Sequence, residues 1–160
     1  MNPLLLIAFC FLLAQVGPAC PAAAQSPDED VRAVIDLLFD GMRSGDSTMV
    51  RAAFHPDARL MTTFTRDGKP MLQTVTIDAF VEAVGKPHDL VWDERIGEVE
   101  IRIDDNLATA WMNYAFYVGD TFSHCGVNAF QLAKGEAGWK VIQIADSRRQ
   151  VACGEVGSER

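Results

Sequence analysis

The chain has 160 residues, with 22 acidic side chains against 14 basic ones and a formal net charge of −8. This length is typical of one domain. An acidic surface repels phosphate backbones, so the charge argues against a nucleic-acid-binding protein.

The N-terminal segment has the pattern of a secretory signal peptide. Its first 25 residues contain no charged side chain, and the stretch 4–16 is nearly all apolar. This stretch is too short for a membrane-spanning helix, which needs about 20 residues. Ala22 and Ala24 then satisfy the small-x-small rule for cleavage. We therefore predict a signal peptide over residues 1–24, no membrane span in the remainder, and a secreted or periplasmic protein.

Cleavage after Ala24 would leave two of the four cysteines, Cys125 and Cys153. Thiols often pair in an oxidising compartment, so we predict a disulfide that ties the C-terminal tail, residues 154–160, to the sheet. The alternative is two unpaired thiols, one of them buried. A lipid anchor at Cys20 is not expected, because the preceding Gly-Pro-Ala is a poor lipobox.

Three helices are predicted in the first half of the chain. Ser26 and Glu29 can form a capping box around Pro27, and the apolar residues that follow recur at helical spacing until Gly45. Asp46 can cap a second helix through Phe54, which residues 55–57 end because the residue before a proline avoids helical geometry. A third helix is expected from Thr76, its cap, to Gly85.

Strands dominate the rest. Asp67-Gly68 is a hairpin signal between strands 58–65 and 69–75. Four further strands, forming an antiparallel meander, are predicted over 98–103, 107–118, 125–133 and 139–145. Helices gathered early and strands gathered late indicate an α+β domain, here over residues 25–153. A curved sheet covered by these helices would leave a cavity open at one end.

Polar residues on apolar strand positions are the candidates for a site within such a cavity. His124 shares its side of the strand with Asn128 and Phe130, which suggests a base or ligand contact beside a hydrogen-bond donor. The alternative is that His124 only caps the strand edge. Tyr114 alternates with Trp111, so one of the two faces the cavity and the other packs elsewhere.

Charged candidates lie near both ends of the sheet region. Asp93 and Glu94 follow Trp92, where a carboxyl could have a raised pKa; the alternative is a solvated strand end. Asp146 and Arg148 could form an ion pair at the cavity mouth or bind an anionic ligand. The predicted ligand-binding set is Trp111, Tyr114, His124, Asn128, Phe130 and Arg148.

Metal and cofactor sites are not expected. The three histidines, His55, His88 and His124, fall on different elements without the short spacing of a ligand pair. The chain has no glycine-rich phosphate loop and no serine nucleophile elbow.

Several strings resemble the nuclear transport factor 2 superfamily, in particular its exported bacterial branch, often labelled SnoaL-like or putative lumazine-binding. They are His55-Pro56-Asp57-Ala58, Ala108 to Trp111, Phe122 to Phe130, and Gly138-Trp139-Lys140 followed by aliphatic residues. The resemblance implies a cone in which three N-terminal helices pack on a curved, mainly antiparallel sheet. It also implies an apolar pocket and a homodimer formed through the sheet.

The resemblance leaves three functions open, because the superfamily includes ketosteroid isomerase, scytalone dehydratase and pure binding proteins. The first is an exported domain that binds a small apolar or cyclic molecule. The second is a cofactor-free isomerase or dehydratase, with His124 or Asp93 as base and Tyr114 as donor. The third is a non-catalytic dimeric partner domain. No acid–base pair stands at a motif position, which favours binding.

Overall fold

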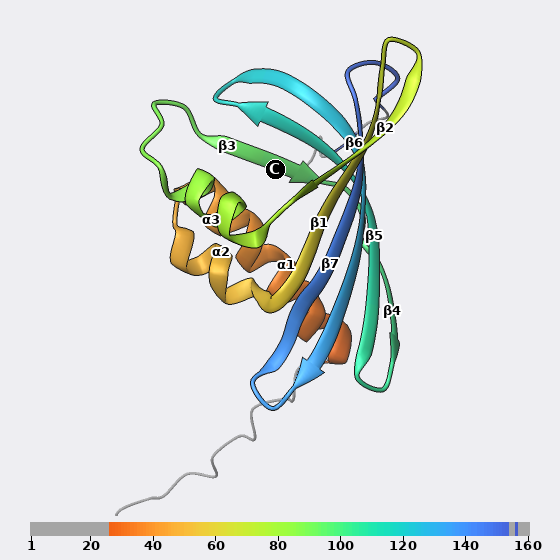
Figure 1. The fold of residues 1–160 in the computed structure, drawn as a ribbon. Helices are drawn as coiled ribbons and strands as arrows, with labels where there is room; N and C mark the ends of the chain where they lie inside the picture. The colour runs from red at the N-terminus through yellow and green to blue at the C-terminus, as the bar shows by residue number, and fades with distance from the viewer. Residues whose placement is uncertain (1–25, 154–155, 157–160) are drawn as a thin grey trace, which may run out of the picture.

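The computed structural model describes residues 26–153 and Val156, so the predicted signal peptide and nearly all of the predicted tail lie outside the described residues. Within this part of the chain, three helices cover one face of a curved seven-stranded sheet (Figure 1). The elements are α1 Pro27–Ser44, α2 Ser47–Ala53, β1 Phe54–Arg66, β2 Lys69–Val75, α3 Ile77–Gly85, β3 Trp92–Ile96, β4 Glu100–Asp104, β5 Leu107–Val118, β6 Thr121–Gly135 and β7 Gly138–Arg149.

The helix ends follow from local capping chemistry, as predicted. The Ser26 side chain accepts from the Glu29 backbone N–H, and the Glu29 carboxylate accepts from the Ser26 N–H at 2.8 Å. Gly45 ends α1 with a left-handed φ of 67°. Asp46 caps α2 and Thr76 caps α3 through their side-chain oxygens.

The β1–β2 hairpin is confirmed, but β1 begins at Phe54 rather than at Ala58. Residues 55–57 are extended because β1 pairs in parallel with β7, from Phe54 opposite Val141. The register shifts between Phe54 and Arg59, and Pro56 falls within this irregular stretch. A proline, which lacks an N–H, is tolerated where the ladder is interrupted.

The sheet has the order β2-β1-β7-β6-β5-β3, and β4 also pairs with β5. The predicted four-stranded meander is confirmed, because β4, β5, β6 and β7 pair in succession as antiparallel neighbours, and β1, β2 and β3 extend the sheet beyond it. β3 pairs with the end of β5, between Tyr114 and Val118, while β4 pairs with its beginning, between Leu107 and Trp111. The parallel β1–β7 pairing joins the N-terminal half of the chain to the C-terminal strand (Figure 1).

The core lies between the helices and the concave face of the sheet. Fully buried side chains of α1, including Ile35 and Leu38, belong to the same apolar cluster as Leu132 of β6 and Val141 of β7. At about 25 cal/mol for each Å² of apolar surface removed from water, this burial supplies the main driving force for folding.

Cys125 of β6 and Cys153, beyond the end of β7, form a disulfide with a Cα–Cα distance of 5.9 Å, which confirms the predicted pairing. It fixes the chain after β7 against the sheet. Between residues 26 and 153, no helix is long and apolar enough to cross a membrane.

Candidate functional site

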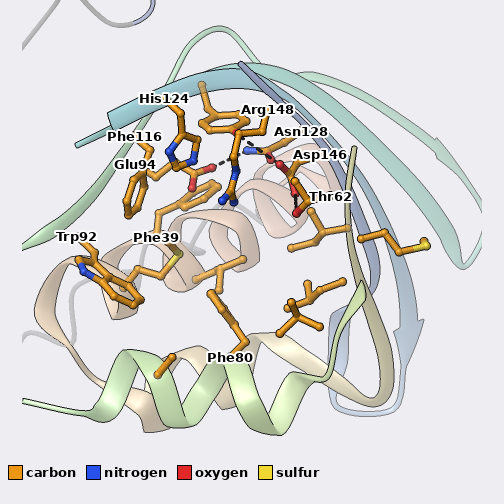
Figure 2. A pocket seen from close by; sticks show the side chains of 18 of the residues that line it. Phe39, Thr62, Phe80, Trp92, Glu94, Phe116, His124, Asn128, Asp146 and Arg148 are labelled. Carbon is orange, nitrogen blue, oxygen red and sulfur yellow. Dashed lines mark hydrogen bonds between the residues drawn. The ribbon is translucent and has the colours of Figure 1, made fainter. Parts of the chain in front are cut away.

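A cavity of about 410 Å³ lies between the helices and the concave face of the sheet. The helices contribute only apolar side chains to its wall: Leu38, Phe39 and Met42 from α1, and Ala79, Phe80 and Ala83 from α3. The sheet contributes Trp92, Phe116 and Phe130 together with a group of polar residues (Figure 2). The helical wall of the cavity is therefore apolar, and the opposite wall, formed by the sheet, holds its polar side chains.

The polar group is assembled from five strands. Its members, from β1 to β7, are Thr62, Glu94, Tyr114, His124, Asn128, Asp146 and Arg148. Residues an even number of positions apart on a strand share a face. His124 and Asn128 of β6 therefore both reach the cavity, and so do Asp146 and Arg148 of β7. Sequence positions up to 86 apart meet because β1, β7, β6, β5 and β3 are consecutive in the sheet.

Glu94 is a carboxyl group poised to change its charge near neutral pH. Its Oε1 atom accepts a hydrogen bond from Nδ2 of the buried Asn128 at 2.7 Å. Burial raises the pKa of Glu94 to about 7, and the nearby Asp146 carboxylate adds to the rise against the opposing effects of Asn128 and Arg148. A group with such a pKa can act as an acid or as a base.

Asp146 is held in place by two hydroxyl groups. Oδ1 accepts from Thr62 Oγ1 at 2.6 Å and Oδ2 accepts from the Tyr114 hydroxyl at 3.2 Å (Figure 2). Burial raises the pKa of Asp146, while the bond from Thr62 and the charge of Arg148 act against the rise. The carboxylate is therefore a fixed part of the wall.

Tyr114 directs its hydroxyl along the sheet rather than into the open cavity. The hydroxyl lies 3.2 Å from Asp146 Oδ2 and 3.1 Å from the Ser147 carbonyl oxygen, and both atoms can only accept. Burial and the Asp146 charge raise the pKa of Tyr114, so the phenol keeps its proton. The tyrosine supports Asp146 in this arrangement.

Arg148 lies in the middle of the polar wall, between Glu94 and Asp146, and His124 lies on the Glu94 side (Figure 2). Arg148 points into the cavity and makes no ion pair within 4.0 Å among the described side chains. Burial, and then the charge of Arg148, lower the pKa of His124 to about 4. His124 is thus neutral at pH 7, with Nδ1 2.9 Å from the Ser123 hydroxyl oxygen.

Five of the predicted ligand-binding residues meet in this cavity: Tyr114, His124, Asn128, Phe130 and Arg148. Trp111 does not line it. Its side chain is 56% exposed and belongs to the alternate side of β5, facing away from the helices.

Asp93 also lies outside the cavity wall, contrary to the prediction that it supplies a base there. It accepts from Arg43 Nε of α1 at 2.9 Å and from Arg95 Nε at 2.8 Å. Burial would raise the pKa of Asp93, but these two hydrogen bonds and charges outweigh burial and lower it. Asp93 therefore joins β3 to α1.

Glu94, rather than Asp93, is the carboxyl group of β3 that lines the cavity. Alternation along β3 could have identified it, because Glu94 shares its side of the strand with Trp92 and Ile96, both packed against the core. The sequence alone does not indicate that Thr62 lines the cavity, because Thr62 meets Asp146 only through the parallel β1–β7 pairing.

Comparisons with known proteins agree with this architecture. The family profile described as putative lumazine-binding matches residues 26–145. An NTF2-like protein from Cytophaga hutchinsonii is similar in structure with a TM-score of 0.62 at 16% identity, over 78% of this chain and 100% of that one. An NTF2-like protein of unknown function from Shewanella baltica gives 0.58 at 19% identity, over 76% and 93% of the two chains.

A protein of unknown function from Mycobacterium tuberculosis is similar with a TM-score of 0.61 at 13% identity, over 78% of this chain and 77% of that one. At these identities the likeness shows the fold alone. No curated protein matches the chain.

Proposed function

The chain belongs to the putative lumazine-binding family of NTF2-like domains, and from this premise we propose that it binds a small apolar or cyclic molecule in the cavity described above. The single observation that carries the proposal is the cavity itself. Its volume of about 410 Å³ falls within the range of small-molecule sites, and its wall combines aromatic rings with a few convergent polar groups.

The aromatic side chains give the expected ligand its shape. Phe39 and Phe130 meet edge to face with ring centroids 6.1 Å apart, and Trp92 and Phe116 do so at 6.3 Å. These rings, with Phe80 of α3, surround the space between the helices and the polar wall (Figure 2). A flat ring system can contact several of them at once, which favours cyclic ligands over branched chains.

The neutral fluorescent probe N-phenyl-1-naphthylamine tests whether the cavity takes an apolar molecule. Wild type is expected to bind it, and Ala83→Phe is expected to weaken binding by about tenfold or more, because the new ring fills space beside α3. Ala33→Phe is the matched control, since Ala33 is exposed on α1 and is not part of the cavity wall. Fluorescence titration of the three proteins gives the affinities.

Failure of wild type to bind the probe would contradict the proposal. So would equal binding by wild type and Ala83→Phe, because the probe would then sit elsewhere on the protein.

A second function, a cofactor-free isomerase or dehydratase, is favoured by Glu94. A carboxyl with a pKa of about 7 in an apolar cavity is suited to moving a proton at neutral pH. In this version Glu94 replaces Asp93 and His124 as the base.

The proton-transfer step has its own test. A two-ring cyclic ketone in heavy water is expected to exchange its α-hydrogens faster with wild type than with Glu94→Gln, as followed by NMR. Glu98→Gln, an exposed change outside the cavity wall, should match wild type. Equal exchange rates for wild type and Glu94→Gln would exclude Glu94 as the base and leave binding as the function.

Export and dimerisation complete the proposal. The Cys125–Cys153 disulfide supports an oxidising compartment. Trp111 and Leu107, 56% and 49% exposed on the face of β5 that points away from the helices, support a homodimer formed through the sheet.

A further inference from the structure

Resting on the proposed function, we infer that the ligand carries a single carboxylate, which Arg148 binds at the polar wall while the ring system lies among the aromatic side chains. The inference comes from the distribution of hydrogen-bond donors and charges around the cavity.

Arg148 is a cation that forms no ion pair with the acidic side chains that the structure describes. It lies near the end of β7, and its guanidinium extends between Glu94 and Asp146 into the cavity (Figure 2). Its charge acts on the pKa of four wall residues, namely Glu94, Tyr114, His124 and Asp146, yet among the described side chains none forms an ion pair with it within 4.0 Å. Arg148 is also exposed at the cavity wall, so its N–H groups are accessible to a ligand.

The two carboxyl groups of the wall already have other partners. Asp146 accepts from Thr62 at one oxygen and from Tyr114 at the other. Glu94 accepts from Asn128 at Oε1. The guanidinium is thus a cation of the wall that pairs with no described acidic side chain, and a planar carboxylate matches its fork of donors.

The charges around the cavity favour a monoanion over a phosphate. Glu94 of β3 and Asp146 of β7 are acidic, Arg148 is basic, and neutral His124, Asn128, Tyr114 and Thr62 complete the polar wall. The helices α1 and α3 add no titratable group to the wall. A dianionic phosphate would meet two carboxyl groups for one guanidinium, whereas a carboxylate needs only Glu94 to take up a proton.

Glu94 is able to take up that proton. Its pKa of about 7 means that an arriving anion, which raises the pKa further, converts it to the neutral acid at ordinary pH. The neutral acid can then donate its O–H to the ligand instead of repelling it.

Three naphthalene probes of one shape test the inference by calorimetric titration: 2-naphthoate, the neutral 2-naphthamide and the cationic 2-naphthylmethylamine. Wild type is expected to bind naphthoate most tightly. Arg148→Met, which removes the charge and keeps an unbranched side chain, should weaken naphthoate by about tenfold or more and leave naphthamide within about twofold. Arg102→Met is the control, because Arg102 lies on β4, pairs with the exposed Glu100 and is absent from the cavity wall.

Glu94→Gln adds a second readout. Wild type should bind naphthoate more tightly as the pH falls from about 8 to 6, and Glu94→Gln, which cannot ionise, should lose most of this dependence.

The outcomes separate the inference from the proposed function. If N-phenyl-1-naphthylamine binds in the cavity but naphthoate binds no better than naphthamide, or Arg148→Met leaves naphthoate unchanged, the carboxylate inference is overturned and the binding function stands. Preference for the cationic amine overturns it as well. If the fluorescent probe and all three naphthalenes fail to bind wild type, the proposed function itself is overturned.

Discussion

Replacing Gly126 with alanine is expected to destabilise the domain by about 4 kcal/mol, near the upper limit for single substitutions. A Cβ at this position would lie 1.7 Å from the Ser147 carbonyl oxygen and 2.9 Å from Tyr114 Cε1. Backbone cannot yield over such a distance without breaking the β6–β7 ladder, where Gly126 is opposite Arg148. Urea unfolding of wild type and variant measures the loss.

The same glycine explains how Tyr114 reaches its partner. Tyr114 is opposite Gly126 in the β5–β6 ladder, and its ring passes over the position where a side chain would stand. Its hydroxyl can then meet Asp146 and Ser147 on the strand beyond. Gly126 is thus a positioning residue for the polar wall.

Gly135 provides the control for this substitution. A Cβ added at Gly135 meets no atom within 4 Å, so Gly135→Ala is expected to change the free energy of unfolding by no more than about 0.5 kcal/mol. If Gly126→Ala were as stable as Gly135→Ala, the close approach of Tyr114 and Ser147 to Gly126 would be wrong.

The helices could be predicted because their signals are local. The Ser26–Glu29 capping box, the left-handed Gly45 and the caps Asp46 and Thr76 each act within four residues along the chain. The parallel β1–β7 pairing could not be predicted, because it joins strands more than 80 residues apart and leaves no short-range pattern. The short strand β3 was not predicted as a separate element; it pairs with the end of β5, between Tyr114 and Val118.

The sequence predicts which residues of a strand share a face, but it does not predict which of the two faces lines the cavity. Alternation along β6 correctly grouped His124 with Asn128 and Phe130. Along β5 the same alternation left Trp111 and Tyr114 as equal alternatives, and only the position of the helices decides that Tyr114 faces inward. Along β3, alternation with Trp92 and Ile96 could have selected Glu94; Asp93 accepts a hydrogen bond from Arg43 of α1 instead.

Glu94 and His124 make opposite contributions to stability as the pH changes. The pKa of Glu94 is raised from 4.5 to about 7, so between these values the folded protein retains a proton that the unfolded chain has released. Stability from this group therefore falls as the pH rises. The pKa of His124 is lowered from 6.5 to about 4, so here the unfolded chain binds the extra proton and stability falls as the pH drops.

Glu94→Gln is accordingly expected to be more stable than wild type by about 3 kcal/mol near pH 8, because it removes the cost of ionising Glu94 in the folded state. Near pH 4 the two proteins should be equally stable, since Glu94 is then protonated in both the folded and the unfolded chain. The amide oxygen of the new glutamine can still accept the Asn128 hydrogen bond. Urea unfolding at a series of pH values measures the difference.

His124→Gln should separate the two contributions. Without the histidine, the free energy of unfolding is expected to fall more steeply than in wild type as the pH rises from about 4.5 to 6.5. The opposing contribution of His124, which rises with pH over this range, is then gone. Glu98→Gln, an exposed change outside the cavity, should reproduce the wild-type curve. Parallel curves for wild type and Glu94→Gln would mean that Glu94 ionises in the folded protein as it does in the unfolded chain. The proton uptake that lets a carboxylate lie beside Glu94 and Arg148 would then be lost, and the carboxylate would have to bind beside two negative charges.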